Sequence, residues 1–189
     1  MTDRSILDSV RGGTLDAELA ALVWLLAEGG VPVHVASTDP LDAVALAGAL
    51  RPFSPSNEPV TVGGGSLEDV LESTAGEPAR LGVVLVLAGG RVAAAHYVRP
   101  PLRDAGGHVR PQNPAVLATW DAGLGTFEHF AWGILPDLAE RIGEHAGDFE
   151  IEQGRRREYL EALVAANIPT EDAGRAIDGY RMATRHPSS

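Results

Sequence analysis

Apolar residues recur at two different spacings along the first third of the chain. Leucine and valine return every three or four residues from 14 to 28, which predicts an amphipathic helix with Thr14 as its N-cap and Gly29 after its end. The short aliphatic run 31–36 is typical of a buried strand, and the segment 40–50, rich in alanine and leucine, predicts another helix. The chain is therefore expected to begin as helix, strand, helix.

The middle third carries the signals of strands and turns. A brief strand at 59–62 precedes three glycines and Ser66, which is expected to cap a short helix over SLEDVLEST. Beyond this helix we expect four strands in two antiparallel pairs, separated by a proline-containing loop from 99 to 114. These pairs are predicted at 81–87 with 91–98 and at 115–120 with 126–131.

The last third is predicted to be helical. Helices are expected at 135–145 and 149–166, and a final helix capped by Thr170 is expected to reach Tyr180. The second of these helices is predicted to bury four aliphatic side chains and to expose three arginines: Ile151, Leu160, Leu163 and Val164 inward, with Arg155, Arg156 and Arg157 outward.

Length and composition bound the fold. The 189 residues are 44% hydrophobic, which suffices for one domain or for one compact domain with an appendage. The pattern predicts an α/β fold, a mixed sheet with flanking helices, divided into an α/β core over 1–133 and a C-terminal helical segment over 134–189. No run approaches the roughly 20 apolar residues of a membrane span, and the opening residues lack the order of a signal peptide. A cytoplasmic protein without membrane insertion is therefore expected.

Charge and missing residue types exclude several functions. The 26 acidic and 15 basic residues give a formal net charge of -11, which argues against a nucleic-acid-binding surface. The absence of cysteine excludes disulfides, thiolate zinc sites and a cysteine nucleophile. All the basic residues are arginine, so the chain offers no lysine for a Schiff base, a serine–lysine dyad or a phosphate loop.

A succession of short motifs runs through the second half of the chain. RVAAAHYVRPP at 91–101 is followed by NPAVLATWD and TFEHFAWG, and then by LPDLAERIG, EQGRRREYLEALVAANI and TEDAGRAIDGY. This order of elements over 91–180 resembles the end of the secretion-superfamily ATPases that drive archaeal flagella, type IV pili and Tad-type pili. The resemblance implies a P-loop-ATPase-like core with a C-terminal helical appendage.

The N-terminal part is similar to the segment of the same family that leads into the phosphate loop, since LVWLLAEGG is followed by the strand VPVHVAS. When GxxxxGK[ST] is laid on the end of this strand, all four signature positions are substituted: Ser37 and Asp42 replace the glycines, Ala43 the lysine and Val44 the hydroxyl residue. Asp42 would repel a phosphate, and Asp39 adds a second carboxylate to the loop, although each acid can also cap a helix.

The family carries further catalytic segments between this loop and a Ser-Leu-Glu helix. Here SLEDVLES at 66–73 follows the preceding helix after only the short span 51–65, which leaves too few residues for them. The resemblance therefore implies no catalytic residue, no cofactor and no metal. It implies instead a non-catalytic, ATPase-like assembly or regulatory partner of a secretion or type IV filament system, which pairs with itself or with a related full-length ATPase.

Two other functions stay open on the sequence alone. The chain is alternatively an unrelated small acidic regulatory or ligand-binding α/β module, or a phosphate-handling enzyme that uses arginines. Positive character gathers in the loop between 99 and 114, where four residues are predicted to contact a partner or an anion: Arg99, Arg103, His108 and Arg110.

The remaining chemistry-bearing residues point to structural roles. The six histidines lack the short spacings of a metal site, although strand alternation could bring His96 and His129 together. No GxSxG turn is present, which disfavours a serine-hydrolase triad. Trp24, Trp120 and Trp132 are expected to fill the core.

Overall fold

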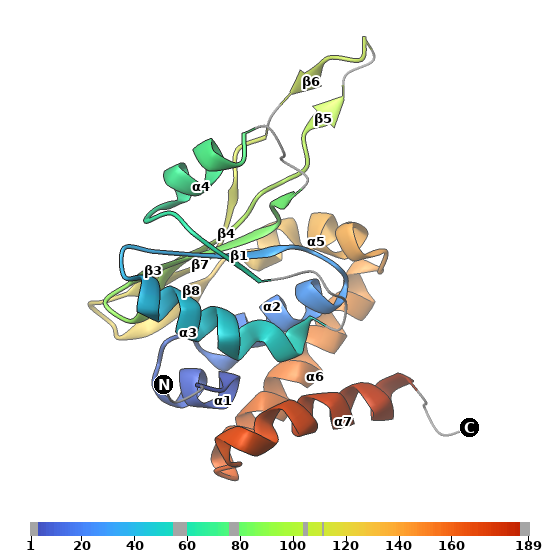
Figure 1. Cartoon of the computed structure of the whole chain (residues 1–189). Helices are drawn as coiled ribbons and strands as arrows, with labels where there is room; N and C mark the ends of the chain where they lie inside the picture. Colours follow the sequence, from blue (N-terminus) through green and yellow to red (C-terminus); the bar gives the residue numbers. More distant parts are fainter. Residues whose placement is uncertain (1–3, 55–59, 76–79, 104–105, 111, 186–189) are drawn as a thin grey trace.

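Six strands form one mixed sheet in the order β2-β1-β3-β4-β7-β8, which confirms the α/β class (Figure 1). The computed structural model describes residues 4–54, 60–75, 80–103, 106–110 and 112–185. Strand β1 pairs in parallel with β2 and β3, whereas β3, β4, β7 and β8 pair antiparallel in succession. The strands are β1 (Val33–Ser37), β2 (Thr61–Val62), β3 (Val83–Ala88), β4 (Arg91–Tyr97), β7 (Ala115–Asp121) and β8 (Thr126–His129).

The helices cover both faces of this sheet. They are α1 (Ile6–Arg11), α2 (Ala17–Glu28), α3 (Pro40–Leu50), α4 (Leu67–Ser73), α5 (Leu135–Ile142), α6 (Ala146–Ala165) and α7 (Ala173–Arg185), with 3-10 turns η1 (Arg51–Phe53), η3 (Ala131–Ile134) and η4 (Thr170–Asp172). Figure 1 shows α4 across the sheet from α2 and α3. None of the helices in the described ranges is long and apolar enough to cross a membrane.

The strand order explains why α3 and α4 lie on opposite faces. The chain moves from β1 to β2 in one direction along the sheet and from β2 to β3 in the other. Two right-handed crossovers in opposite directions must place their helices on opposite faces. Accordingly Val35 joins the large core under α2 and α3, while its neighbour Ala36 joins a small second core with Val70 of α4.

Several helix starts differ from the sequence expectation. Helix α2 begins at Ala17 and is capped by Asp16, whose Oδ1 accepts a hydrogen bond from the Leu19 amide at 2.9 Å. Thr14 is not the cap, because its carbonyl is taken by the Val92 amide of β4 at 2.8 Å. Thr170 is not a cap either, since its hydroxyl donates to Asp8 at 2.7 Å. The predicted Ser66 cap of α4 is confirmed.

The arginine face of α6 also differs from the prediction. Arg156 is 5% exposed, whereas Ile151, which was expected inside, is 55% exposed. Arg156 turns inward because a ring and a carboxylate receive it there. Its guanidinium lies 4.7 Å from the centre of the Trp24 ring, and its Nη1 donates to Glu28 at 3.0 Å.

Glu28 collects further partners around the same ring. Its Oε2 accepts hydrogen bonds from the Trp24 indole at 2.9 Å and from Nε of Arg181 at 3.1 Å. Arg181 is 7% exposed, and the Tyr180 ring meets Trp24 edge-on with centroids 5.1 Å apart. We call Trp24, Glu28, Arg156, Tyr180 and Arg181 the Glu28 cluster. It joins the end of α2 to α6 and α7.

We predict that Glu28→Gln lowers the free energy of unfolding by about 3 kcal/mol, because it leaves two buried guanidinium groups without their shared carboxylate. Urea denaturation measures the change. Arg175→Gln is the matched control, since it breaks the ion pair with Asp172 on the exposed start of α7, and we expect a loss below about 1 kcal/mol. Equal losses in the two variants would show that the Glu28 cluster contributes no more than a surface pair.

Candidate functional site

The turn between β1 and α3 occupies the place in the fold where open α/β sheets bind ligands. The chain leaves β1 towards β2 on one side and returns to β3 on the other. Crevices at such reversals, beyond the carboxyl ends of parallel strands, hold phosphates and nucleotides in many folds. The four substituted positions lie here: Ser37 ends β1, and Asp42, Ala43 and Val44 lie in the first turns of α3.

Several backbone amides of this turn donate hydrogen bonds within the protein. The Ser37 amide donates to the Gly64 carbonyl at 2.9 Å, and the Asp39 amide donates to the Ser37 hydroxyl at 3.0 Å. Asp39 caps α3 by accepting from the Leu41 amide at 2.8 Å. Pro40 has no amide to offer. A phosphate would have to displace these bonds to be held as phosphate loops hold it.

Side chains in the turn reinforce this arrangement. Ala43, at the lysine position of the motif, is buried in the core, so this position does not face a ligand. Asp42 lies in the first turn of α3, where its negative charge is stabilised by the positive end of the helix dipole. Gly64 has a φ of 74°, and a Cβ there would lie 3.1 Å from atoms of Asp69 and Val70. The glycine segment therefore packs closely against α4 and the turn.

The predicted positive cluster is divided by the structure. Two short strands, β5 (Leu102–Arg103) and β6 (Val109–Arg110), pair antiparallel and project from the sheet as a hairpin (Figure 1). Residues His108 and Arg110 are exposed on this β5–β6 hairpin. Arg99 lies at its base and forms an ion pair with Asp137 of α5 at 3.3 Å. Three of the four predicted residues thus share one projecting element.

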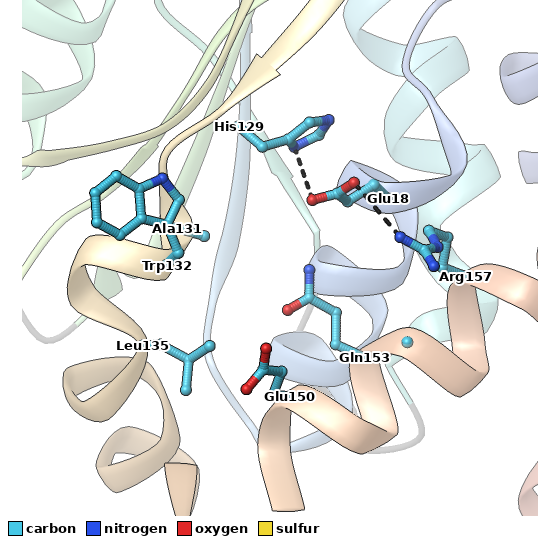
Figure 2. A pocket seen from close by; sticks show the side chains of 9 residues that line it. Glu18, His129, Ala131, Trp132, Leu135, Glu150, Gln153 and Arg157 are labelled. Carbon is cyan, nitrogen blue, oxygen red and sulfur yellow. Dashed lines mark ion pairs between the residues drawn. The ribbon is translucent and has the colours of Figure 1, made fainter. Parts of the chain in front are cut away.

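A pocket of about 320 Å³ lies on another part of the surface, between α2, the η3–α5 segment and α6. Figure 2 shows its polar groups: His129 from the end of β8, Glu18 from α2, and residues of α6. The residues from α6 are spaced three, four and seven positions apart, which places them on one helix face. The pocket is lined by Glu18, His129, Ala131, Trp132, Leu135, Glu150, Gln153, Gly154 and Arg157.

His129 and Arg157 are both held by carboxylates. His129 Nε2 lies 2.8 Å from Asp16, and its Nδ1 lies 3.8 Å from Glu18. Arg157 lies 3.9 Å from Glu18 and 3.9 Å from Glu161. Burial alone lowers the pKa of His129, but the hydrogen bond to Asp16 and the charges of Asp16 and Glu18 outweigh it and raise the pKa. The two carboxylates therefore favour the charged form of the imidazole.

The possible pairing of His96 with His129 was wrong. His96 lies on β4 opposite Val116 of β7, and burial lowers the pKa of His96. His129 lies two strands away on β8 and bonds to Asp16 at the start of α2. Within the described ranges, no three His, Cys, Asp or Glu side chains are grouped closely enough to hold a metal ion.

Two pocket residues differ from what the sequence favoured. Trp132 was expected in the core, but it is 77% exposed at the pocket. Its neighbours explain this, because η3 buries Ala131 and leaves the next residue on the outer side of the turn. Glu150 is exposed opposite Leu135 (Figure 2), and no ion pair is formed by it in the part of the chain that the structure describes. The tryptophan gave no sequence signal of exposure, whereas Glu150 belongs to a run of acids and arginines for which the sequence favoured intrahelical ion pairing over a binding face.

The lining residues offer groups that can bind a ligand. They include no serine, threonine or tyrosine that could act as a nucleophile, and both nitrogens of His129 face carboxylates instead of an open space. An exposed indole, an aliphatic side chain, a carboxamide and an unpaired carboxylate are groups that recognise a ligand by shape and charge. The sequence matches no known family model, and no curated protein is significantly similar to it.

We predict a pH dependence of stability from His129. Its folded-state pKa lies above the unfolded value of about 6.5, so its stabilising effect is complete below that value and is lost as the pH rises through the folded-state pKa. Asp16→Asn keeps a capping oxygen for α2 but removes the charge beside His129. Urea denaturation at several pH values between 5 and 9 should therefore show a weaker loss with rising pH in Asp16→Asn than in the wild type.

His96 acts in the opposite direction and at lower pH: because its pKa is lowered, its contribution to stability rises with pH up to about 6.5. The quantity to compare is therefore the difference between variant and wild type at each pH. A difference that does not change with pH would contradict the charged state assigned to His129.

Proposed function

We propose that the chain is a non-catalytic, ATPase-like protein that serves as an assembly or regulatory partner in a secretion or type IV filament system. The observation that carries this proposal is the closed turn between β1 and α3. It follows a buried strand and begins a helix, as a phosphate loop does, and Gly64, Ser37 and Asp39 accept hydrogen bonds from three of its amides. The short-motif resemblance over 91–180 supplies the choice of system.

The surface near this turn supports a partner instead of a nucleotide. Leu41 is 71% exposed and Val44, one turn further along α3, is 47% exposed. Such side chains beside a ligand crevice cannot contribute to phosphate binding, but they are suited to contact another protein. The β5–β6 hairpin adds a second contact element with exposed His108 and Arg110. Since the chain carries a net charge of -11, this basic hairpin complements the acidic surface of a second copy.

A ligand-binding module is the second candidate function. The pocket with the exposed Trp132 and Glu150 favours it, because within the described part of the chain Glu150 forms no ion pair and Trp132 is not buried in the core. An enzyme that handles phosphate with arginines is less well supported. Arg156 and Arg181 are bound by Glu28, and Arg157 lies between two glutamates.

The first test of the proposal is nucleotide binding. We expect isothermal titration with ATP and magnesium to give no saturable heat at concentrations up to about 1 mM, because binding would have to break the turn's own hydrogen bonds next to two carboxylates. Asp42→Asn, which removes one of these charges, should not restore binding, since the amides remain occupied. Micromolar binding with turnover by the wild type would overturn the proposal.

The second test is self-association. At low salt, light scattering after size exclusion should show a mass that rises with protein concentration, and Arg110→Glu should weaken this association about tenfold by placing like charges against each other. Arg175→Glu is the matched control, because it makes the same charge change on the exposed start of α7. If the protein stays monomeric at all concentrations, it does not pair with itself, and the proposal then requires a different protein as the partner.

A further inference from the structure

Among the residues that the structure describes, one carboxylate of the pocket has no counterion. Asp16, Glu18 and Glu161 surround the basic groups of His129 and Arg157 at one end. A bound anion would compete with these carboxylates for groups that are already neutralised. The charge in the pocket that no opposite charge balances is therefore a negative one.

That charge belongs to Glu150 at the other end of the pocket. Figure 2 shows Glu150 and Gln153 reaching from α6 towards the segment that carries Trp132 and Leu135. Trp132 is 77% exposed, so one face of its indole is open to a ligand. An indole face attracts a cation, and an aliphatic neighbour packs against the methylene stem of a long basic side chain.

From this arrangement we propose that the pocket binds an arginine side chain that a partner polypeptide presents. Leu135 and Trp132 would contact the methylene stem and the guanidinium plane, and Glu150 and the Gln153 carboxamide oxygen would accept its N–H groups. The volume of about 320 Å³ is at the small end for ligand sites, which suits one side chain better than a large cofactor. A free amino acid fits less well, because its α-carboxylate would meet the acidic surroundings.

This inference goes beyond the proposed function and does not depend on it. The pocket shares no residue with the turn between β1 and α3, so a result on nucleotide binding leaves the arginine site untouched. In the same way, loss of arginine binding would leave the closed turn as it is. The two proposals therefore fail separately.

The test uses the full chain and the capped peptide acetyl-Gly-Arg-Gly-amide, followed by the indole N–H signals in proton–nitrogen NMR spectra. We expect a saturable shift of the Trp132 signal in the millimolar range and no shift of the buried Trp24 signal. Glu150→Gln should weaken binding about fivefold, as expected for one exposed ion pair. Glu158→Gln is the matched control, because it makes the same change at an exposed position of α6 outside the pocket lining.

Two further peptides test whether the pocket distinguishes the charge of the bound side chain. Acetyl-Gly-Gln-Gly-amide should shift the Trp132 signal weakly, and acetyl-Gly-Glu-Gly-amide should not shift it. Stronger binding of the glutamate peptide would overturn the proposal, because His129 and Arg157 would then be the recognising groups. The proposal would equally be overturned by a Trp132 signal that no peptide moves, or by equal effects of Glu150→Gln and Glu158→Gln. The same spectra show whether each variant is folded.

Discussion

Three helices of the chain meet at a single carboxylate oxygen. Oε2 of Glu28, at the end of α2, accepts hydrogen bonds from Trp24 of its own helix, from Arg156 of α6 and from Arg181 of α7. This carboxylate and the Trp24 ring receive the two buried guanidinium groups, and each guanidinium has one further carboxylate partner: Glu152 for Arg156 and Asp178 for Arg181. Next to them, burial and the Glu152 carboxylate raise the pKa of Tyr180 to about 12, so its hydroxyl stays a hydrogen-bond donor to Glu152. The position of α6 and α7 on α2 depends on this cluster.

The rotation of α6 that buries Arg156 also determines the pocket. With Phe149, Arg156 and Leu160 inside, the helix face that carries Gln153 and Arg157 must turn towards α2 and the η3–α5 segment. The ligand-facing and core-facing sides of α6 are therefore set by one interaction. Weakening the Glu28 cluster would disturb the pocket even though none of its five residues lines it.

The sequence predicted the fold better than the site, and the reason is visible in particular residues. Aliphatic periodicity located α3, β3, β4, β7 and α6 to within a few residues. Aliphatic side chains have no polar group, so their spacing shows directly which face of an element is buried. The same reasoning placed Arg156 outside and Ile151 inside. A pattern of residue types cannot show that Trp24 and Glu28 of α2 lie next to Arg156 in the folded protein. Trp132 was misplaced for a related reason: tryptophan usually fills a core, and its exposure follows from the tertiary position of η3.

In the turn between β1 and α3, side chains of the protein accept hydrogen bonds from backbone amides of the kind that a phosphate loop offers to its ligand. An empty phosphate loop leaves several backbone amides to water, and a bound phosphate then satisfies them. Here side chains of the chain accept these hydrogen bonds. The Ser37 hydroxyl accepts from the Asp39 amide at 3.0 Å, and the Asp39 carboxylate accepts from the Leu41 amide at 2.8 Å. A carboxylate that caps a helix and a phosphate bound at its N-terminus satisfy the same donors and the same dipole. A capping carboxylate and a bound phosphate therefore exclude each other. With the Asp39 cap in place, this turn needs no phosphate to keep its conformation.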